Sequence, residues 1–144
     1  MNNKSLFDQF VSFTTDVHQV TYDLTKDVKT DDITPVQYRI LEYIAVSQPV
    51  TLSQISECQH MSMPNTSREL RKLSEKQLCE KYTADEDRRK QYFRLSERGQ
   101  SRMDEAFQQI RARFEQRIHH LNNAELQEIE RALDVLHTKV FYLE

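Results

Sequence analysis

The chain has 144 residues, enough for one domain (residues 1–144) with a modest core, and combines 38% hydrophobic with 30% charged side chains at a formal net charge of −3. No apolar run approaches the roughly 18 residues of a membrane span, and the amino terminus lacks the pattern of a secretory signal, so we expect a cytoplasmic protein. The single glycine, Gly99, excludes glycine-rich phosphate and dinucleotide loops and thereby most nucleotide-dependent enzymes.

Apolar residues near the amino terminus repeat in steps of four and three, without an intervening proline or glycine. This spacing predicts one long helix with a single apolar stripe. The stripe consists of Leu6, Phe10, Phe13, Val17, Val20 and Leu24.

The next helix begins with a strong start signal. Thr34 is placed as the N-cap, and Gln37 stands where a capping box has Glu or Gln. Ile33 and Tyr38 are spaced to close a hydrophobic staple across this start. We expect a helix over residues 35–46.

Two more helix starts follow in close succession. Thr51 and Gln54 form a second capping box for a short helix over 52–58, and Ser62 is the N-cap of a helix over 63–76. Only three residues separate these helices, so the chain must turn sharply between them. This arrangement predicts a helix-turn-helix whose second helix is the candidate DNA reader.

The second of these helices has two distinct sides. Steps of 100° per residue group Thr66, Leu70 and Leu73 on a side that packs against the core. The opposite side carries amide, guanidinium and ammonium groups, which can bond guanine, adenine and phosphate; a plain solvated face is the alternative interpretation. The candidate DNA-binding residues here are Ser62, Pro64, Asn65, Ser67, Arg68, Arg71 and Lys72.

A β-hairpin is predicted next. Residues 78–83 and 91–96 are β-favouring runs, and the polar residues 84–90 join them as a charged tip. A protruding arginine at such a tip can enter a narrow minor groove, and an adjacent aspartate can stiffen the loop; a polar turn without a partner is the alternative. The candidate DNA-binding residues of this hairpin are Asp87, Arg88, Arg89 and Lys90.

Two amphipathic helices end the chain. Ser96 is a candidate cap for the first, and Asn122 with Glu125 forms a capping box for the last, whose apolar residues from Leu126 to Leu143 follow a heptad. The expected fold is therefore mainly α with a small β-hairpin. We assign 33–99 to a winged helix-turn-helix DNA-binding region and the helices of 1–30 and 100–144 to dimerisation.

The cysteines and histidines indicate no metal or cofactor. Cys58 and Cys79 match neither a redox pair nor a zinc cluster, and each is either an oxidation sensor or a small hydrophobic residue. The five histidines lack the spacing with a nearby carboxylate that helical zinc sites use.

The hairpin carries a family resemblance. Asp87 and Arg89, followed at fixed spacing by Leu95, Ser96 and Gly99, resemble the D-x-R-x5-L-[TS]-x2-G wing signature of MarR-family regulators. The upstream segments ITPVQYRILEYI, TLSQISE and MSMPNTSRELRKL are similar to that family's second, third and recognition helices.

This resemblance implies a triangular homodimer with interlocking terminal helices, a pseudopalindromic operator, and repression that a ligand or oxidant relieves. The chain departs from the family pattern after the recognition helix. Gln77 stands where glycine is common, so it either adopts a left-handed conformation or the helix ends differently.

Three classes of function compete. The leading hypothesis is a dimeric DNA-binding transcriptional regulator, a repressor released by a small-molecule or redox signal. A helical adaptor or antirepressor that does not contact DNA is the alternative, but it would not need a basic centre: residues 51–99 carry 10 basic and 8 acidic side chains, whereas both flanking segments are acidic. An enzyme ranks third, because no nucleophile, metal or phosphate motif is recognisable.

Overall fold

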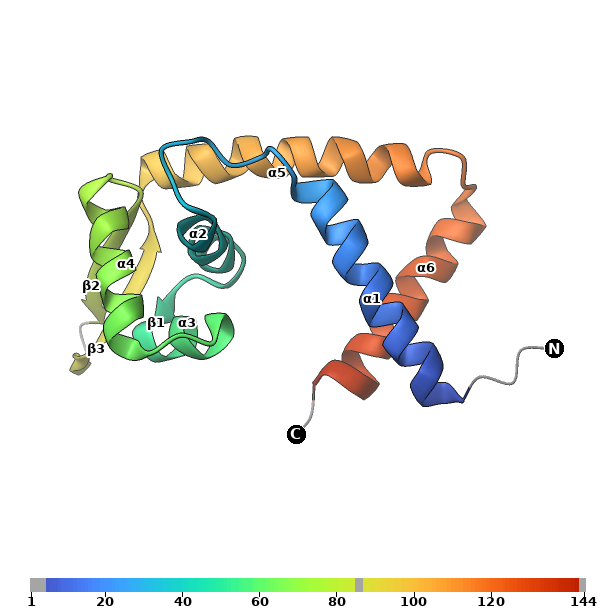
Figure 1. Ribbon diagram of the computed structural model, residues 1–144, viewed down its shortest axis with the longest axis horizontal. Helices are drawn as coiled ribbons and strands as arrows, with labels where there is room; N and C mark the ends of the chain where they lie inside the picture. Colours follow the sequence, from blue (N-terminus) through green and yellow to red (C-terminus); the bar gives the residue numbers. More distant parts are fainter. Residues whose placement is uncertain (1–4, 85–86, 143–144) are drawn as a thin grey trace. The chain divides into compact units, whose positions relative to one another are not determined.

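The computed structural model describes residues 5–84 and 87–142 (Figure 1). The chain divides into two compact units, Met1–Ile110 and Arg111–Glu144, and the boundary falls inside α5. The predicted assignment of 1–30, 33–99 and 100–144 to separate roles stays a prediction. The elements in chain order are α1 (Leu6–Thr25), α2 (Pro35–Ser47), β1 (Val50–Thr51), α3 (Leu52–Gln59), α4 (Met63–Glu75), β2 (Cys79–Ala84), β3 (Asp87–Leu95), α5 (Glu97–Ile118), α6 (Asn123–Leu136) and the π-helix η1 (His137–Phe141).

The fold class is confirmed as mainly α with a small antiparallel sheet that bears the wing. The predicted hairpin is present, but the sheet has a third strand and the order β1-β3-β2. In β1, Val50 pairs with Phe93 and Thr51 with Tyr92. A strand of two residues has too little pattern to be predicted, because only its distant partner makes it a strand.

The three predicted capping boxes are confirmed. At the start of α2, the Gln37 amide N–H donates to Thr34 Oγ1 at 3.1 Å, and the Thr34 amide N–H donates to Gln37 Oε1 at 3.2 Å. Side-chain oxygens thereby satisfy backbone donors that have no partner within the helix. The three pairs are Thr34–Gln37, Thr51–Gln54 and Asn122–Glu125.

Helices α3 and α4 both end on a residue in the left-handed region, His60 with φ 54° and Gln77 with φ 62°. After α4, the amide N–H of Leu78 donates to the Leu73 carbonyl at 3.0 Å, and that of Gln77 donates to the Ser74 carbonyl at 2.9 Å. This pair of bonds is a Schellman motif, which normally favours glycine at the left-handed position. The first alternative for Gln77 is therefore confirmed.

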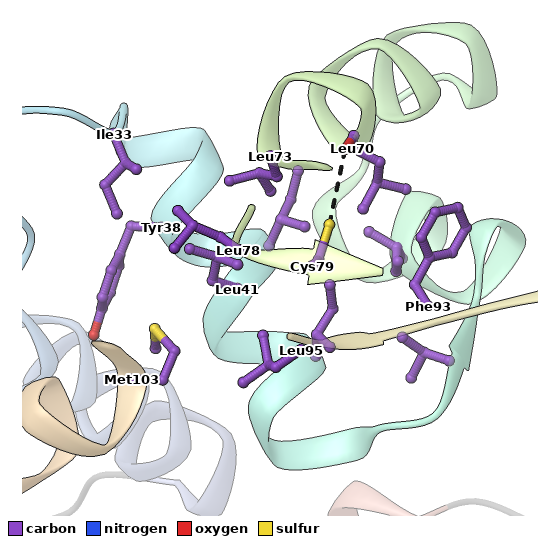
Figure 2. Packing of buried hydrophobic residues seen from close by; sticks show 14 of the residues in the cluster. Ile33, Tyr38, Leu41, Leu70, Leu73, Leu78, Cys79, Phe93, Leu95 and Met103 are labelled. Carbon is purple, nitrogen blue, oxygen red and sulfur yellow. Dashed lines mark hydrogen bonds between the residues drawn. The ribbon is translucent and has the colours of Figure 1, made fainter. Parts of the chain in front are cut away.

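The buried core joins α2, α3 and α4 to the sheet and to the first half of α5 (Figure 2). Figure 2 shows the Ile33 side chain next to Tyr38, as expected of a hydrophobic staple, with Met103 close by. The fully buried large side chains include Ile40, Leu41, Ile44, Ile55, Leu70, Leu73, Leu78 and Met103.

Gly99 lies where α5 crosses the start of β2. A Cβ atom at this position would lie 1.9 Å from the carbonyl oxygen of Leu78, so no larger residue fits without movement of the backbone. Ser96 holds the crossing together: its hydroxyl donates to the Gln77 carbonyl at 2.6 Å and accepts from the Gly99 amide at 2.9 Å. This geometry gives a physical reason for the spacing of serine and glycine after β3.

The carboxyl-terminal unit departs from the predicted regular helix. The predicted heptad runs to Leu143, which lies outside the described residues, but after Leu136 the helix already widens into η1. The Tyr142 amide there donates to the His137 carbonyl at 3.1 Å. A π-turn inserts a residue into the helical repeat, so the predicted heptad register ends at α6. Within the described part of the chain, no helix is long and apolar enough to cross a membrane.

Candidate nucleic-acid interface

Helix α4 is held against the core by one side and presents the other to solvent. Thr66, Leu70 and Leu73 are almost fully buried, as the 100° steps predicted. The hydroxyl of Thr66 is satisfied locally because it donates to the Ser62 carbonyl at 2.9 Å. All seven candidate residues of this helix are exposed: Ser62, Pro64, Asn65, Ser67, Arg68, Arg71 and Lys72.

These residues do not have equal freedom to bind a partner. Ser62 is the N-cap, and its hydroxyl already accepts the Asn65 amide N–H at 3.2 Å, so its first role is to start the helix. Lys72 Nζ lies 3.5 Å from a carboxylate oxygen of Glu69 in a loose, exposed ion pair. Within the described residues, neither Arg68 nor Arg71 has a hydrogen-bond or ion-pair partner, so both guanidinium groups are available to a ligand.

The wing differs from the predicted hairpin in where the strand begins. Residues 87–90 belong to β3 rather than to the connecting tip, because Ala84 pairs with Asp87 across an irregularity in the register. Arg89 and Lys90 are exposed on this strand, and the side chains of Asp87 and Arg88 lie outside the description. The backbone therefore places residues 87–90 on the strand, where the sequence predicted them in the connecting tip.

Two adjoining grooves connect the wing to the helix-turn-helix. The first, about 430 Å³, lies between α4 and the sheet, and Ser67, Arg71 and Lys81 line it. The second, about 530 Å³, lies between the start of α3 and β3, and Arg89 and Lys90 line it. Both grooves share Leu52 and Gln91, so they form one continuous surface.

Sequence reasoning missed several residues of this surface. Lys81 and Gln91 lie on the strands and Ser53 at the start of α3, and all three line the grooves. Alternation along β2 could have identified Lys81, because it places Lys81 on the same face of the strand as Cys79, which also lines the first groove. Ser53 and Gln91 carry no signal in the sequence beyond polarity.

The exposed face of the sheet is stiffened by stacking. The rings of Tyr82 and Tyr92, which pair across β2 and β3, stack with centroids 5.9 Å apart. The Arg94 guanidinium lies 4.4 Å from the centre of the Tyr82 ring, and its Nε lies 3.2 Å from a Glu80 carboxylate oxygen. Such cross-strand pairs stabilise the hairpin that presents Arg89 and Lys90.

A polar cluster fastens the segment before α2 to α5. Arg102 donates from Nη2 to Asp32 Oδ2 at 2.7 Å and from Nη1 to Oδ1 at 3.0 Å, and Thr30 also donates to Asp32. These hydrogen bonds, with Arg102 first, hold the pKa of the Asp32 carboxyl well below its usual range. The pair therefore stays charged at neutral pH.

The two cysteines lie in different environments. Cys58 is exposed on α3, whereas Cys79 is buried, with its Sγ 3.8 Å from the Leu70 carbonyl oxygen (Figure 2). Burial raises the pKa of the Cys79 thiol, which disfavours the reactive thiolate. Cys79 therefore behaves as a small core residue.

Comparison with known proteins agrees with this geometry. Residues 31–90 match the model of the MarR family. A MarR family protein from Bacillus stearothermophilus superimposes with a TM-score of 0.80 at 15% identity, and 99% of each chain is covered. No curated protein sequence matches the chain.

Two further solved structures were obtained with bound molecules. A mutant of S. aureus MepR bound to an oligodeoxyribonucleotide is 19% identical, with a TM-score of 0.58, and the match covers 92% of this chain and 97% of that one. S. aureus MarR in complex with salicylate and kanamycin is 21% identical, with a TM-score of 0.68, and the match covers 92% and 90%. At such identities the likeness concerns the fold.

Proposed function

We propose, from the match of residues 31–90 to the MarR family, that the chain is a repressor that binds a pseudopalindromic DNA operator as a homodimer. Regulators of this family act by binding DNA and not by catalysis. The two recognition helices of the dimer would enter successive major grooves about 34 Å apart. Occupation of the promoter would then block transcription.

The observation that carries this proposal is the exposed polar side of α4. Arg68 and Arg71 have no protein partner among the described residues, and the buried side of the helix fixes the direction in which they point. A guanidinium held in this way can bond O6 and N7 of guanine or bridge phosphates. The MepR mutant with a bound oligodeoxyribonucleotide, which shares this fold, supports DNA as the partner.

The homodimer is supported by apolar surface that a single copy leaves uncovered. In α1, Leu6 is 82% and Phe7 is 72% exposed, and in α6 Leu133 is 58% exposed. Apolar side chains repeated along helices at this exposure are normally buried by a partner. A second copy of the chain, which supplies matching helices, fits this need.

Release by a small molecule is the remaining part of the proposal. Support comes from S. aureus MarR, whose structure contains salicylate and kanamycin. A ligand that binds better to a conformation unable to span two grooves would shift the population away from DNA.

The test begins with selection of bound duplexes from a randomised library, followed by titration of the selected duplex. Arg68→Ala and Arg71→Ala should each weaken binding by about 1 to 3 kcal/mol per lost bidentate contact to a base. Arg111→Ala is the matched control, because it removes the same charge from an exposed position of α5 outside the grooves.

The outcome distinguishes two functions. If the chain selects no duplex, the DNA-binding proposal is wrong and the adaptor hypothesis takes its place. If a duplex is selected but both arginine variants bind it as tightly as the parent at matched salt, α4 is not the reading helix.

A further inference from the structure

Gln37 is 2% exposed, and its amide joins the start of α2 to two places around the recognition helix. Its Oε1 accepts from Lys76 Nζ at 2.8 Å, just beyond the end of α4. Its Nε2 donates to Glu69 Oε2 at 3.0 Å, in the middle of α4. The sequence explains Gln37 as the N3 residue of a capping box, but in that motif its side chain needs only the bond from the Thr34 amide to Oε1.

The orientation of this amide is determined by its neighbours. The Thr34 backbone N–H and the Lys76 ammonium can only donate, so the oxygen of Gln37 must face them. The Glu69 carboxylate can only accept, so the nitrogen must face it. All three bonds are therefore satisfied by one rotamer, and rotation of the amide would break them together.

Glu69 is the acidic side chain of α4 nearest to the reading residues. It follows Arg68 directly in the sequence, its side chain is 21% exposed, and its Oε1 lies 3.5 Å from Lys72 Nζ. A carboxylate released from Gln37 could approach DNA phosphates and repel them, or pair more closely with Lys72 and neutralise it. Either change would weaken the basic character of this face.

The same chain of bonds continues to α5. Lys76 Nζ also donates to the Asp32 carbonyl at 2.6 Å, and the carboxylate of Asp32 is held by Arg102. Gln37 thus lies at the centre of a polar network that reaches α4 on one side and α5 on the other.

We propose that Gln37 is a positioning residue for DNA recognition, which holds the Glu69 carboxylate away from the DNA and fixes α4 at its middle and its end. The inference rests on the proposed DNA-binding function and adds a residue that does not itself touch DNA. If Gln37 has this role, the side chain at position 37 affects discrimination between DNA sequences as well as the stability of the fold.

The experiment exchanges the amide of Gln37 and the carboxylate of Glu69 between the two positions. Gln37→Glu keeps an acceptor for Thr34 and Lys76 but places a second carboxylate against Glu69, so the two repel. In the double variant, Glu69→Gln supplies an amide that can donate to the new carboxylate at position 37, so the hydrogen bond returns with donor and acceptor reversed. Glu69→Gln alone leaves an oxygen at position 69 that still accepts from Gln37 Nε2. Gln108→Glu, at an exposed position of α5, controls for the change in net charge.

The readout is the ratio of affinity for the selected duplex to affinity for an unrelated duplex of equal length. It is measured at fixed salt and at a temperature where circular dichroism shows each variant to be folded. Gln37→Glu should lower this ratio about tenfold, and the double variant should recover to within about threefold, as expected for coupled neighbours. The control and Glu69→Gln should keep the parent ratio.

Different outcomes contradict the positioning role and the DNA-binding proposal. A folded Gln37→Glu with the parent ratio, or a double variant that does not recover, overturns the positioning role while the DNA-binding proposal stands. If the parent selects no duplex, the proposed function itself fails. Should Gln37→Glu not fold, Glu69→Asp decides the question, because it withdraws the carboxylate from Gln37 at constant charge and should lower the ratio; an unchanged ratio overturns the inference.

Discussion

Replacement of Gly99 by alanine tests the crossing of α5 over β2, because two effects of opposite sign compete there. Alanine is favoured over glycine inside a helix by about 0.8 to 1 kcal/mol. Against this, the new methyl group would lie 1.9 Å from the Leu78 carbonyl oxygen, whereas ordinary contacts begin at 3.4 Å. The helix and the strand would have to separate by about 1.5 Å at this point.

That movement costs free energy because the new methyl group would meet backbone atoms of Leu78, which cannot rotate away as a side chain can. Leu78 is fully buried, and its carbonyl accepts the Ser96 amide at 3.2 Å, so it cannot move without loss of that bond. Overpacking of a core costs about 1 to 3 kcal/mol, and a lost hydrogen bond about 1 kcal/mol more. Gly99→Ala should therefore lower the free energy of unfolding by about 1 to 3 kcal/mol after the gain in helix propensity.

The assay is urea unfolding followed by circular dichroism, at equal protomer concentration because a dimer's stability depends on it. With a slope of about 1 to 3 kcal/mol per molar urea, the midpoint should fall by about 1 M. Ser101→Ala, at an exposed position of the same helix, is the control and should raise the midpoint slightly. A Gly99→Ala midpoint equal to or above that of the parent would refute the steric argument.

Three further predictions follow from the exposure of particular side chains. Leu133→Asp should shift the sedimentation equilibrium toward monomer at micromolar concentration, since Leu133 is proposed to lie in the dimer interface; a parent that sediments as a folded monomer contradicts this. Arg89→Ala should reduce the magnitude of the slope of log K against log salt by about 0.9 per wing, or about 1.8 per dimer, and an unchanged slope would remove Arg89 from the interface. A thiol reagent at pH 8 should modify only Cys58 in the native protein and both cysteines in denaturant, because burial raises the pKa of Cys79 and keeps its thiol protonated; rapid loss of the Cys79 thiol in the native state would contradict this.

The helix starts were predictable because their signals are local. The box of Thr34 and Gln37 lies within four consecutive residues, and the structure reproduces both of its hydrogen bonds. The buried side of α4 was predictable for a similar reason, since a helix has one fixed angular step. Residues such as Thr66 could therefore be assigned to the core from spacing alone.

Features that depend on distant partners were not predictable. Strand β1 exists because Val50 meets Phe93, and β3 begins early because Asp87 meets Ala84. No local pattern in 84–90 distinguishes a strand from a loop, since every residue of the segment except Ala84 is polar. For the same reason the sequence predicted the role of Gln37 in the helix cap but not its hydrogen bond to Glu69, which lies 32 positions away.

The candidate interface was partly predictable. The exposed residues of α4 were identified from periodicity, and their exposure agrees with that prediction. The grooves that bring Arg71 near Lys81 and Arg89 near Ser53 could not be predicted, because they depend on how the sheet packs beside α3 and α4. Whether each residue contacts DNA stays a prediction.

Thr51 belongs both to the sheet and to the start of α3, and this limits which segments of the protein could be exchanged with those of its relatives. Its backbone pairs with Tyr92 of the wing, while its hydroxyl accepts the Gln54 amide at 3.2 Å and so starts α3. Gln48 adds a second link, since its Oε1 accepts the Leu95 amide at 3.0 Å. A chimera that imports a foreign wing over 79–95 alone would meet a mismatched edge at 48–51, so the modular unit for grafting is the wing together with that short segment.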